Sequence, residues 1–248
     1  MAIRQFADWL ETPQGRYVLG WEQAKLDNIL ADIFGFNAVQ LGFPQIDYLR
    51  ANRMPFRFCC CAGEAGAVAV QSDPHQLPFA ANSLDLVVLP HILEFDANPH
   101  QILREVDRVL VPEGSAVVIG FNPYSLWGLR RLFAGRGGRP PWRGGYISVP
   151  RLRDWFALLG HESRAGAFGC YVPPVRQEKW LRRWHFMEPA GDRWWPIAGG
   201  VYIVQAIKRQ HGMRLVMPKW RDRMARAKAL ALMPQKPLAQ KNQFMDRQ

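Results

Sequence analysis

Short apolar runs alternate along this chain with longer segments in which apolar residues recur every three or four positions. The longer segments predict helices at residues 2–11, 16–34, 97–110, 126–133 and 149–159. The short runs predict buried strands at residues 38–41, 56–61, 67–70, 84–89, 116–119, 161–168 and 200–207. Strands that alternate with helices and end in a pair of late strands are typical of an α/β fold with a mostly parallel sheet.

Length and composition place the chain among ordinary globular proteins. Its 248 residues suffice for one domain with appendages, and its 48% apolar and 21% charged residues exclude a disordered, collagen-like or coiled-coil protein. We expect a helical segment at residues 1–35, a domain at 36–207 with a tryptophan-rich insertion at 173–196, and a basic, flexible tail at 208–248. No apolar stretch suits a signal peptide or a transmembrane helix, which predicts a cytoplasmic protein.

The net charge of +11 is concentrated in two segments. Residues 1–129 carry 8 basic and 14 acidic side chains, whereas residues 130–153 carry 7 basic and no acidic ones. The tail at 208–248 carries 11 basic and 2 acidic side chains. Such a tail can hold RNA or another anionic partner, and a solvated tail is the alternative. The charge therefore bears on partners more than on the function of the domain.

The four cysteines, Cys59, Cys60, Cys61 and Cys170, do not form a disulfide pattern. Adjacent positions on a strand point to opposite faces, so three consecutive cysteines cannot build a disulfide framework. No spacing of cysteine and histidine suits zinc. We predict reduced thiols that pack as small apolar residues, and no metal site.

The most specific stretch covers residues 72–131. It begins at a strand end with Asp73, continues through a Leu-Pro-Phe turn and a buried strand, and reaches a loop with Pro90 and His91. An amphipathic helix, a Pro-Glu-Gly turn and another strand follow. In an open α/β sheet the ligand crevice lies outside the carboxyl ends of the strands. Asp73 and the Pro90-His91 loop are therefore predicted to lie beside a ligand.

This stretch resembles the class I S-adenosylmethionine-dependent methyltransferases that act on small molecules and quinones. The matching residues are Asp73, Leu77-Pro78-Phe79, Ser83 with Asp85, Leu93-Glu94, Leu103-Arg104-Glu105, Arg108-Val109-Leu110, and Pro112 with Gly114. A weaker match extends over residues 36–207. The resemblance implies a Rossmann-like sheet with helices on both faces, S-adenosyl-L-methionine as the cofactor and a small-molecule substrate.

The resemblance also implies roles for individual residues. In that family the aspartate that matches Asp73 contacts the adenine amino group, and the loop that matches Pro90-His91 lies beside the methionine part of the cofactor. We therefore expect Asp73, Pro90 and His91 to bind cofactor.

The chain departs from the family near its first strands. Of the glycine-rich loop after the first strand only Gly42 is present, and Gln40 stands in place of the family's acid. Glu64, 22 residues after Gly42, is the candidate for the ribose hydroxyls, with an ordinary turn residue as the alternative. A crossover helix between the second and third strands is missing, because only about four residues at 63–66 separate them.

The catalytic base is not identified by the sequence, and His91, Tyr124 and Tyr146 are candidates. The arginines at 130–143, interleaved with Trp127 and Trp142, could hold phosphates or an acidic substrate, or form a solvated loop. The tryptophan-rich insertion could cap an apolar pocket, touch a membrane interface, or serve as a lid. Three functions stay open: methyl transfer to a small molecule, a methyltransferase fold that only binds or scaffolds, and an RNA methyltransferase that uses the tail.

Overall fold

The computed structural model describes residues 2–62, 69–134, 140–175 and 177–209. Glu64 and nearly all of the basic tail predicted at 208–248 lie outside the described residues. Among the residues described, no helix combines the length and the apolar character that a bilayer span requires.

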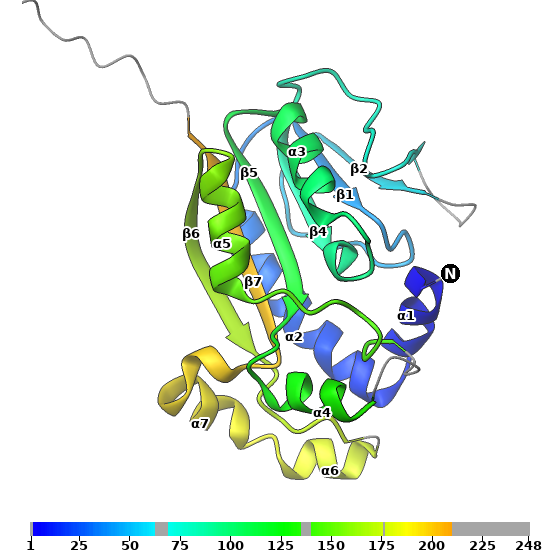
Figure 1. Cartoon of the computed structure of the whole chain (residues 1–248), viewed down its shortest axis with the longest axis vertical. Helices are drawn as coiled ribbons and strands as arrows, with labels where there is room; N and C mark the ends of the chain where they lie inside the picture. Colours follow the sequence, from blue (N-terminus) through cyan, green and yellow to red (C-terminus); the bar gives the residue numbers. More distant parts are fainter. Residues whose placement is uncertain (1, 63–68, 135–139, 176, 210–248) are drawn as a thin grey trace, which may run out of the picture. The chain divides into compact units, whose positions relative to one another are not determined.

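A seven-stranded sheet with the order β3-β2-β1-β4-β5-β7-β6 forms the centre of the described structure (Figure 1). Its strands are β1 (Asn37–Leu41), β2 (Phe56–Cys61), β3 (Val70–Gln71), β4 (Leu84–Pro90), β5 (Leu110–Phe121), β6 (His161–Gly169) and β7 (Val201–Lys208). Neighbouring strands from β3 to β5 pair in parallel, and β7 pairs antiparallel with both β5 and β6. The predicted mostly parallel α/β sheet with an antiparallel late strand is confirmed.

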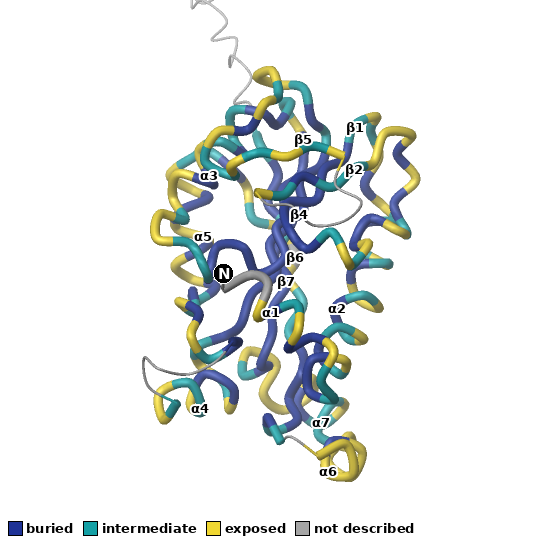
Figure 2. Tube along the Cα trace, turned by 90° about the vertical axis from the view of Figure 1, so that its right-hand side faces the viewer, coloured by how far each residue is buried: buried dark blue, intermediate teal, exposed yellow. Residues whose placement is uncertain are grey.

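Helices cover both faces of the sheet, as predicted. On one face lie α3 (Pro99–Val109) and α5 (Val149–Leu158), and on the other lie α1 (Ala2–Leu10) and α2 (Pro13–Ala31). Alternate residues of β4 enter the two cores: Val87 and Leu89 face α3 and α5, and Leu86 and Val88 face α1 and α2. All four side chains are fully buried, and Figure 2 shows the central strands as buried along most of their length. This burial on both faces explains the almost continuous apolar run of β4.

The bounds of most strands and helices differ from the predicted ones by one to three residues, and three differences have structural consequences. Helix α2 begins at Pro13 instead of residue 16, because Thr12 caps it by accepting the backbone N–H of Gly15 at 3.2 Å. Strand β3 contains only two residues. Strand β5 is twelve residues long and includes the predicted Pro-Glu-Gly turn as a bulge, at which Leu86 of β4 pairs with Ser115.

The remaining helices lie beyond the carboxyl end of β5 (Figure 1), except for the short one that directly follows β4. These are α4 (Leu126–Ala134), α6 (Glu178–Arg183), α7 (Met187–Trp194) and the short helices η1 (Ile92–Glu94) and η2 (Pro196–Ala198). The insertion predicted at 173–196 contains α6 and α7. The connections from β1 to β2 and from β3 to β4 contain no helix, and both lie within the described residues.

The division into a segment at 1–35 and a domain at 36–207 stays a prediction, and the packing of α2 allows a test of it. Leu26 of α2 is fully buried in the core shared with β4 and β5. We expect Leu26→Ala to lower the free energy of unfolding by about 2–4 kcal/mol in a single transition, because the cavity it leaves lies in that shared core. Denaturant unfolding of the full chain measures this, with Lys25→Ala on the exposed face as the control. Two separate transitions would contradict a shared core.

Candidate active site

Four of the five predicted cofactor residues lie at one edge of the sheet. Gly42 directly follows β1, Asp73 lies two residues after β3, and Pro90 ends β4 with His91 next to it. Because β1 to β5 run in parallel, their carboxyl ends meet at this edge. Glu64, the fifth, lies outside the described residues. The fold therefore brings the described candidates to the place where open α/β sheets bind ligands.

Asp73 presents an exposed carboxylate, 63% accessible, at the end of β3. Its Oδ1 accepts the backbone N–H of His75 at 2.9 Å and lies 2.7 Å from Nδ1 of the His75 ring. The other ring nitrogen of His75 lies 2.9 Å from Oδ1 of Asp96. The backbone N–H of His75, followed by its ring, lowers the pKa of Asp73. The group is thus a fixed, ionised acceptor, and the described residues place no donor on its Oδ2.

The turn after β1 is organised by Gln40, which is 2% exposed. Its Nε2 lies within 3.0 Å of three backbone carbonyls, those of Gly42, Phe43 and Ile46. Its Oε1 accepts the backbone N–H of Tyr48 at 2.9 Å. Gly42 and Phe43 both have left-handed backbone conformations, with φ of 82° and 51°. The residue in place of the family's acid therefore shapes the turn itself, a role that the sequence analysis missed.

His91 lies between two buried carboxylates. Its Nε2 is 2.7 Å from Oε1 of Glu22 in α2, and its Nδ1 is 2.9 Å from Oε2 of Glu94 in η1. Burial alone would lower the pKa of His91, but the charges of Glu22 and Glu94 outweigh it and raise the pKa to about 10. Tyr48 donates to the second oxygen of Glu22 at 3.2 Å, and the backbone N–H of Phe121 donates to the second oxygen of Glu94. Both ring nitrogens of His91 are thus occupied.

The side chain of Phe6 in α1 covers His91. Its ring centroid lies 4.9 Å from that of His91, 5.4 Å from that of Phe43 and 6.1 Å from that of Phe121. These three rings follow or end β1, β4 and β5, so the fully buried Phe6 fills the space between three strand ends. In this arrangement His91 reaches neither solvent nor a ligand. Its predicted contact with cofactor or substrate therefore requires a displacement of α1.

The two tyrosine candidates lie apart from each other. Tyr146 stacks on Phe121 at 5.1 Å, its hydroxyl is buried without a partner from the described residues, and burial raises its pKa well above the ordinary value. Tyr124 is 72% exposed beyond β5, where it lines an apolar cavity of about 850 Å³ with α4 and α7. A neutral phenol such as Tyr146 is a weak base. His91 and Tyr146 both pack on the Phe121 ring, at 4.7 and 5.1 Å, whereas the exposed Tyr124 lies apart from them.

Comparison with known proteins agrees with this geometry. Residues 50–118 match the family model described as "Methyltransferase domain". Protein YafS of Escherichia coli K12, itself uncharacterized, is 31% identical over 154 residues, which cover 62% of this chain and 64% of that protein.

Two solved structures share the fold. A methyltransferase from Thermotoga maritima that depends on S-adenosylmethionine is 14% identical with a TM-score of 0.58, and the match covers 76% of this chain and 89% of that chain. The [4+2]-cyclase SpnF is 18% identical with a TM-score of 0.51, over 75% of this chain and 80% of its own. The resemblance to class I methyltransferases and the Rossmann-like fold are confirmed.

The cluster around His91 generates a pH prediction. Between pH 6.5, the ordinary pKa of a histidine, and about pH 10, the folded chain holds a proton on His91 that the unfolded chain has lost. The free energy of unfolding should therefore fall as the pH rises through this range. Glu22→Gln preserves the shape but removes one charge that raises the pKa of His91, so its melting temperature should fall less between pH 7 and 10. Calorimetry measures both, with the exposed Glu11→Gln as the control; an equally steep fall in Glu22→Gln would refute this assignment.

Proposed function

We propose that this protein transfers a methyl group from S-adenosyl-L-methionine to a small-molecule acceptor. The observation that carries the proposal is the convergence of Gly42, Asp73 and Pro90 at the carboxyl edge of a sheet whose fold is shared with a solved methyltransferase. The methyltransferase-domain match over residues 50–118 includes Asp73 and Pro90 and supports the same function.

The residues at the end of β3 suit the adenine end of the cofactor. The Oδ2 atom of Asp73 would accept a hydrogen bond from the exocyclic amine of the adenine. The backbone N–H and the ring of His75 hold the other carboxylate oxygen, Oδ1, in place. An ionised acceptor makes a stronger hydrogen bond than a neutral one. Gly42 itself turns the backbone after β1 in a left-handed conformation and has no side chain that would obstruct a ligand.

The methionine end of the cofactor requires space that Phe6 occupies. S-adenosyl-L-methionine supplies the methyl group on a sulfonium, and the task of the protein is to hold acceptor and sulfonium in line. The Pro90-His91 loop, whose counterpart in the family lies beside the methionine part of the cofactor, is covered by the Phe6 ring. We infer that α1 moves away from the ends of β1 and β4 when the cofactor binds, because the Phe6 ring packs directly on His91.

A binding module without catalysis is the second candidate. Two observations favour it: Phe6 fills the crevice between three strand ends, and Gln40 fastens the turn that in the family approaches the cofactor. In such a module α1 would stay in place permanently. The two functions therefore differ in whether the cofactor binds at all.

Calorimetry with S-adenosylhomocysteine separates these functions. We expect saturable binding, and we expect Asp73→Ala to weaken it at least tenfold, because a charge-assisted hydrogen bond of about 1.5–3 kcal/mol is lost. Asp96→Asn is the matched control, since it alters the far side of the His75 contact and leaves Asp73 in place. Absence of binding at millimolar cofactor would leave the binding module as the function.

The inferred displacement of α1 has its own test. Phe6→Ala removes the contacts that hold α1 over His91, so a larger share of molecules should be open and S-adenosylhomocysteine should bind more tightly. Leu10→Ala on the same helix is buried but is not among the Phe6 ring partners, and it serves as a control for general destabilisation. Isothermal calorimetry below the melting temperature of each variant measures the effect. Weaker or unchanged binding in Phe6→Ala would show that the cofactor does not displace this side chain.

A further inference from the structure

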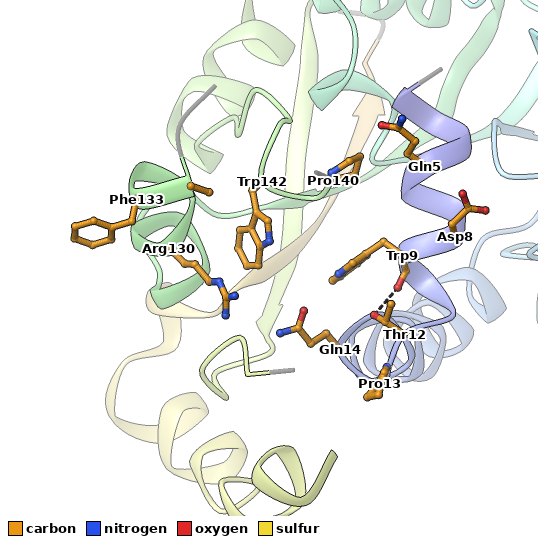
Figure 3. A pocket seen from close by; sticks show the side chains of 11 residues that line it. Gln5, Asp8, Trp9, Thr12, Pro13, Gln14, Arg130, Phe133, Pro140 and Trp142 are labelled. Atoms are coloured by element: carbon orange, nitrogen blue, oxygen red, sulfur yellow. Dashed lines mark hydrogen bonds between the residues drawn. The ribbon is translucent and has the colours of Figure 1, made fainter. Parts of the chain in front are cut away.

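A second cavity, of about 950 Å³, is lined by Gln5, Asp8 and Trp9 of α1. It is enclosed by α1, the beginning of α2, α4 and the chain around Pro140 and Trp142 (Figure 3). Its volume is within the range of small-molecule sites. Trp9 connects it to the strand ends, because the Trp9 ring lies in the cavity wall and also packs against Phe121 at 6.0 Å.

Two buried donors in the wall of this cavity have no acceptor. The indole Nε1 of Trp9 and the amide Nε2 of Gln14 are buried and make no hydrogen bond within the described structure. The two residues are only 8% and 5% exposed. A buried donor without a partner costs about 1–3 kcal/mol, so two in one wall indicate a ligand that brings acceptor oxygens. Figure 3 shows the Gln14 amide extending from α2 toward Arg130.

Positive potential reaches the same place from two sources. The first turn of the nineteen-residue α2, at Thr12, Pro13 and Gln14, lines the cavity, and helix N-termini attract anions. Arg130 of α4 also lines it, with its guanidinium 5.0 Å from the Trp142 ring and a hydrogen bond to the carbonyl of Pro174. Asp8 is the acid in the lining, and Figure 3 shows its carboxylate pointing away from the Gln14 amide.

Flat aromatic surfaces complete the wall. Trp9 and Trp142 both line the cavity, and Trp142 stacks on the buried Trp127 with ring centroids 5.7 Å apart. Indole faces favour planar ligands over branched aliphatic ones, because offset stacking adds to the burial of apolar area.

We propose that this cavity binds a small planar carboxylic acid, whose carboxylate accepts hydrogen bonds from Trp9 and Gln14 and whose planar body lies against the tryptophans. The role of this acid as the methyl acceptor rests on the proposed function. The binding of the acid to the cavity does not depend on that function. The cavity adjoins the carboxyl end of β5, because Trp9 in its wall packs against Phe121 at the end of that strand.

The test uses benzoate as the probe and benzamide as its neutral analogue. In the 15N-labelled full chain, the Nε1–H resonance of Trp9 is identified by its loss in Trp9→Phe. We expect benzoate to shift this resonance saturably and benzamide, at equal concentration and ionic strength, to leave it in place, because only the carboxylate carries a charge.

Variants locate the binding by calorimetry. Gln14→Leu should weaken benzoate binding at least tenfold, and Trp9→Phe, which keeps an aromatic ring without the N–H, should weaken it several-fold. The exposed Gln45→Leu in the turn after β1 is the matched control and should bind as the parent does. The spectrum of each variant checks that it is folded. Binding of S-adenosylhomocysteine, measured in the same samples, reports on the proposed function separately.

Three outcomes with benzoate and benzamide would overturn the proposal. These are an equal shift with benzamide, parent-like affinity in both folded variants, or no saturation with benzoate at tens of millimolar. Inorganic phosphate is a further arm: if it binds at Gln14 as tightly as benzoate does, the planar acid is the wrong class. If benzoate fails while S-adenosylhomocysteine binds, the substrate class is wrong and the proposed methyl transfer is not.

Discussion

The carboxyl ends of β4 and β5 depend on one buried cluster of charges, in which His91 lies between Glu22 and Glu94. Buried charges are stable only when they are paired and hydrogen-bonded, so the three groups fix one another and the helices that carry them. Through Glu22 the cluster holds α2 against the sheet, and through the backbone N–H of Phe121 it holds the end of β5. His91 itself adopts a left-handed conformation, with φ of 50°, that directs its ring into this position.

Helix α1 packs against this cluster through Phe6. Phe6 packs on the His91 ring and closes the edge between β1 and β4, and one turn along the same helix Trp9 borders the cavity beside Gln14. A displacement of α1 that exposes the ends of β1 and β4 therefore also changes the wall of that cavity. The ends of β1 and β4 and the cavity beside Gln14 are thus coupled through the single short helix α1. This coupling gives a physical reason for a cofactor and a second ligand to influence each other's binding.

The parts of the fold that could be predicted from sequence are those whose local pattern of apolar residues is compatible with only one type of element. The run of β4 is apolar on both faces and α3 is apolar on one, so the central β4–α3–β5 unit and the position of Asp73 followed directly. The partners of His91 could not be predicted, because Glu22 precedes it by 69 residues and only the packing of α2 brings them together. The cover formed by Phe6 was missed for the same reason. The sequence predicts a turn where the structure has a bulge in β5, because Pro and Gly are typical of both.

Gln40 departs from the family pattern and has a structural role of its own in the turn after β1. Its amide donates toward the carbonyls of Gly42, Phe43 and Ile46 and accepts from Tyr48. A carboxylate at this position would only accept, so it would face three carbonyl oxygens without a proton to offer them. The acid of the family is therefore incompatible with the hydrogen bonds that hold this turn. The replaced residue and the rebuilt loop depend on each other, and the turn holds Phe43 where it can pack against Phe6. The cover over the strand ends is thus built into the same residues that depart from the family.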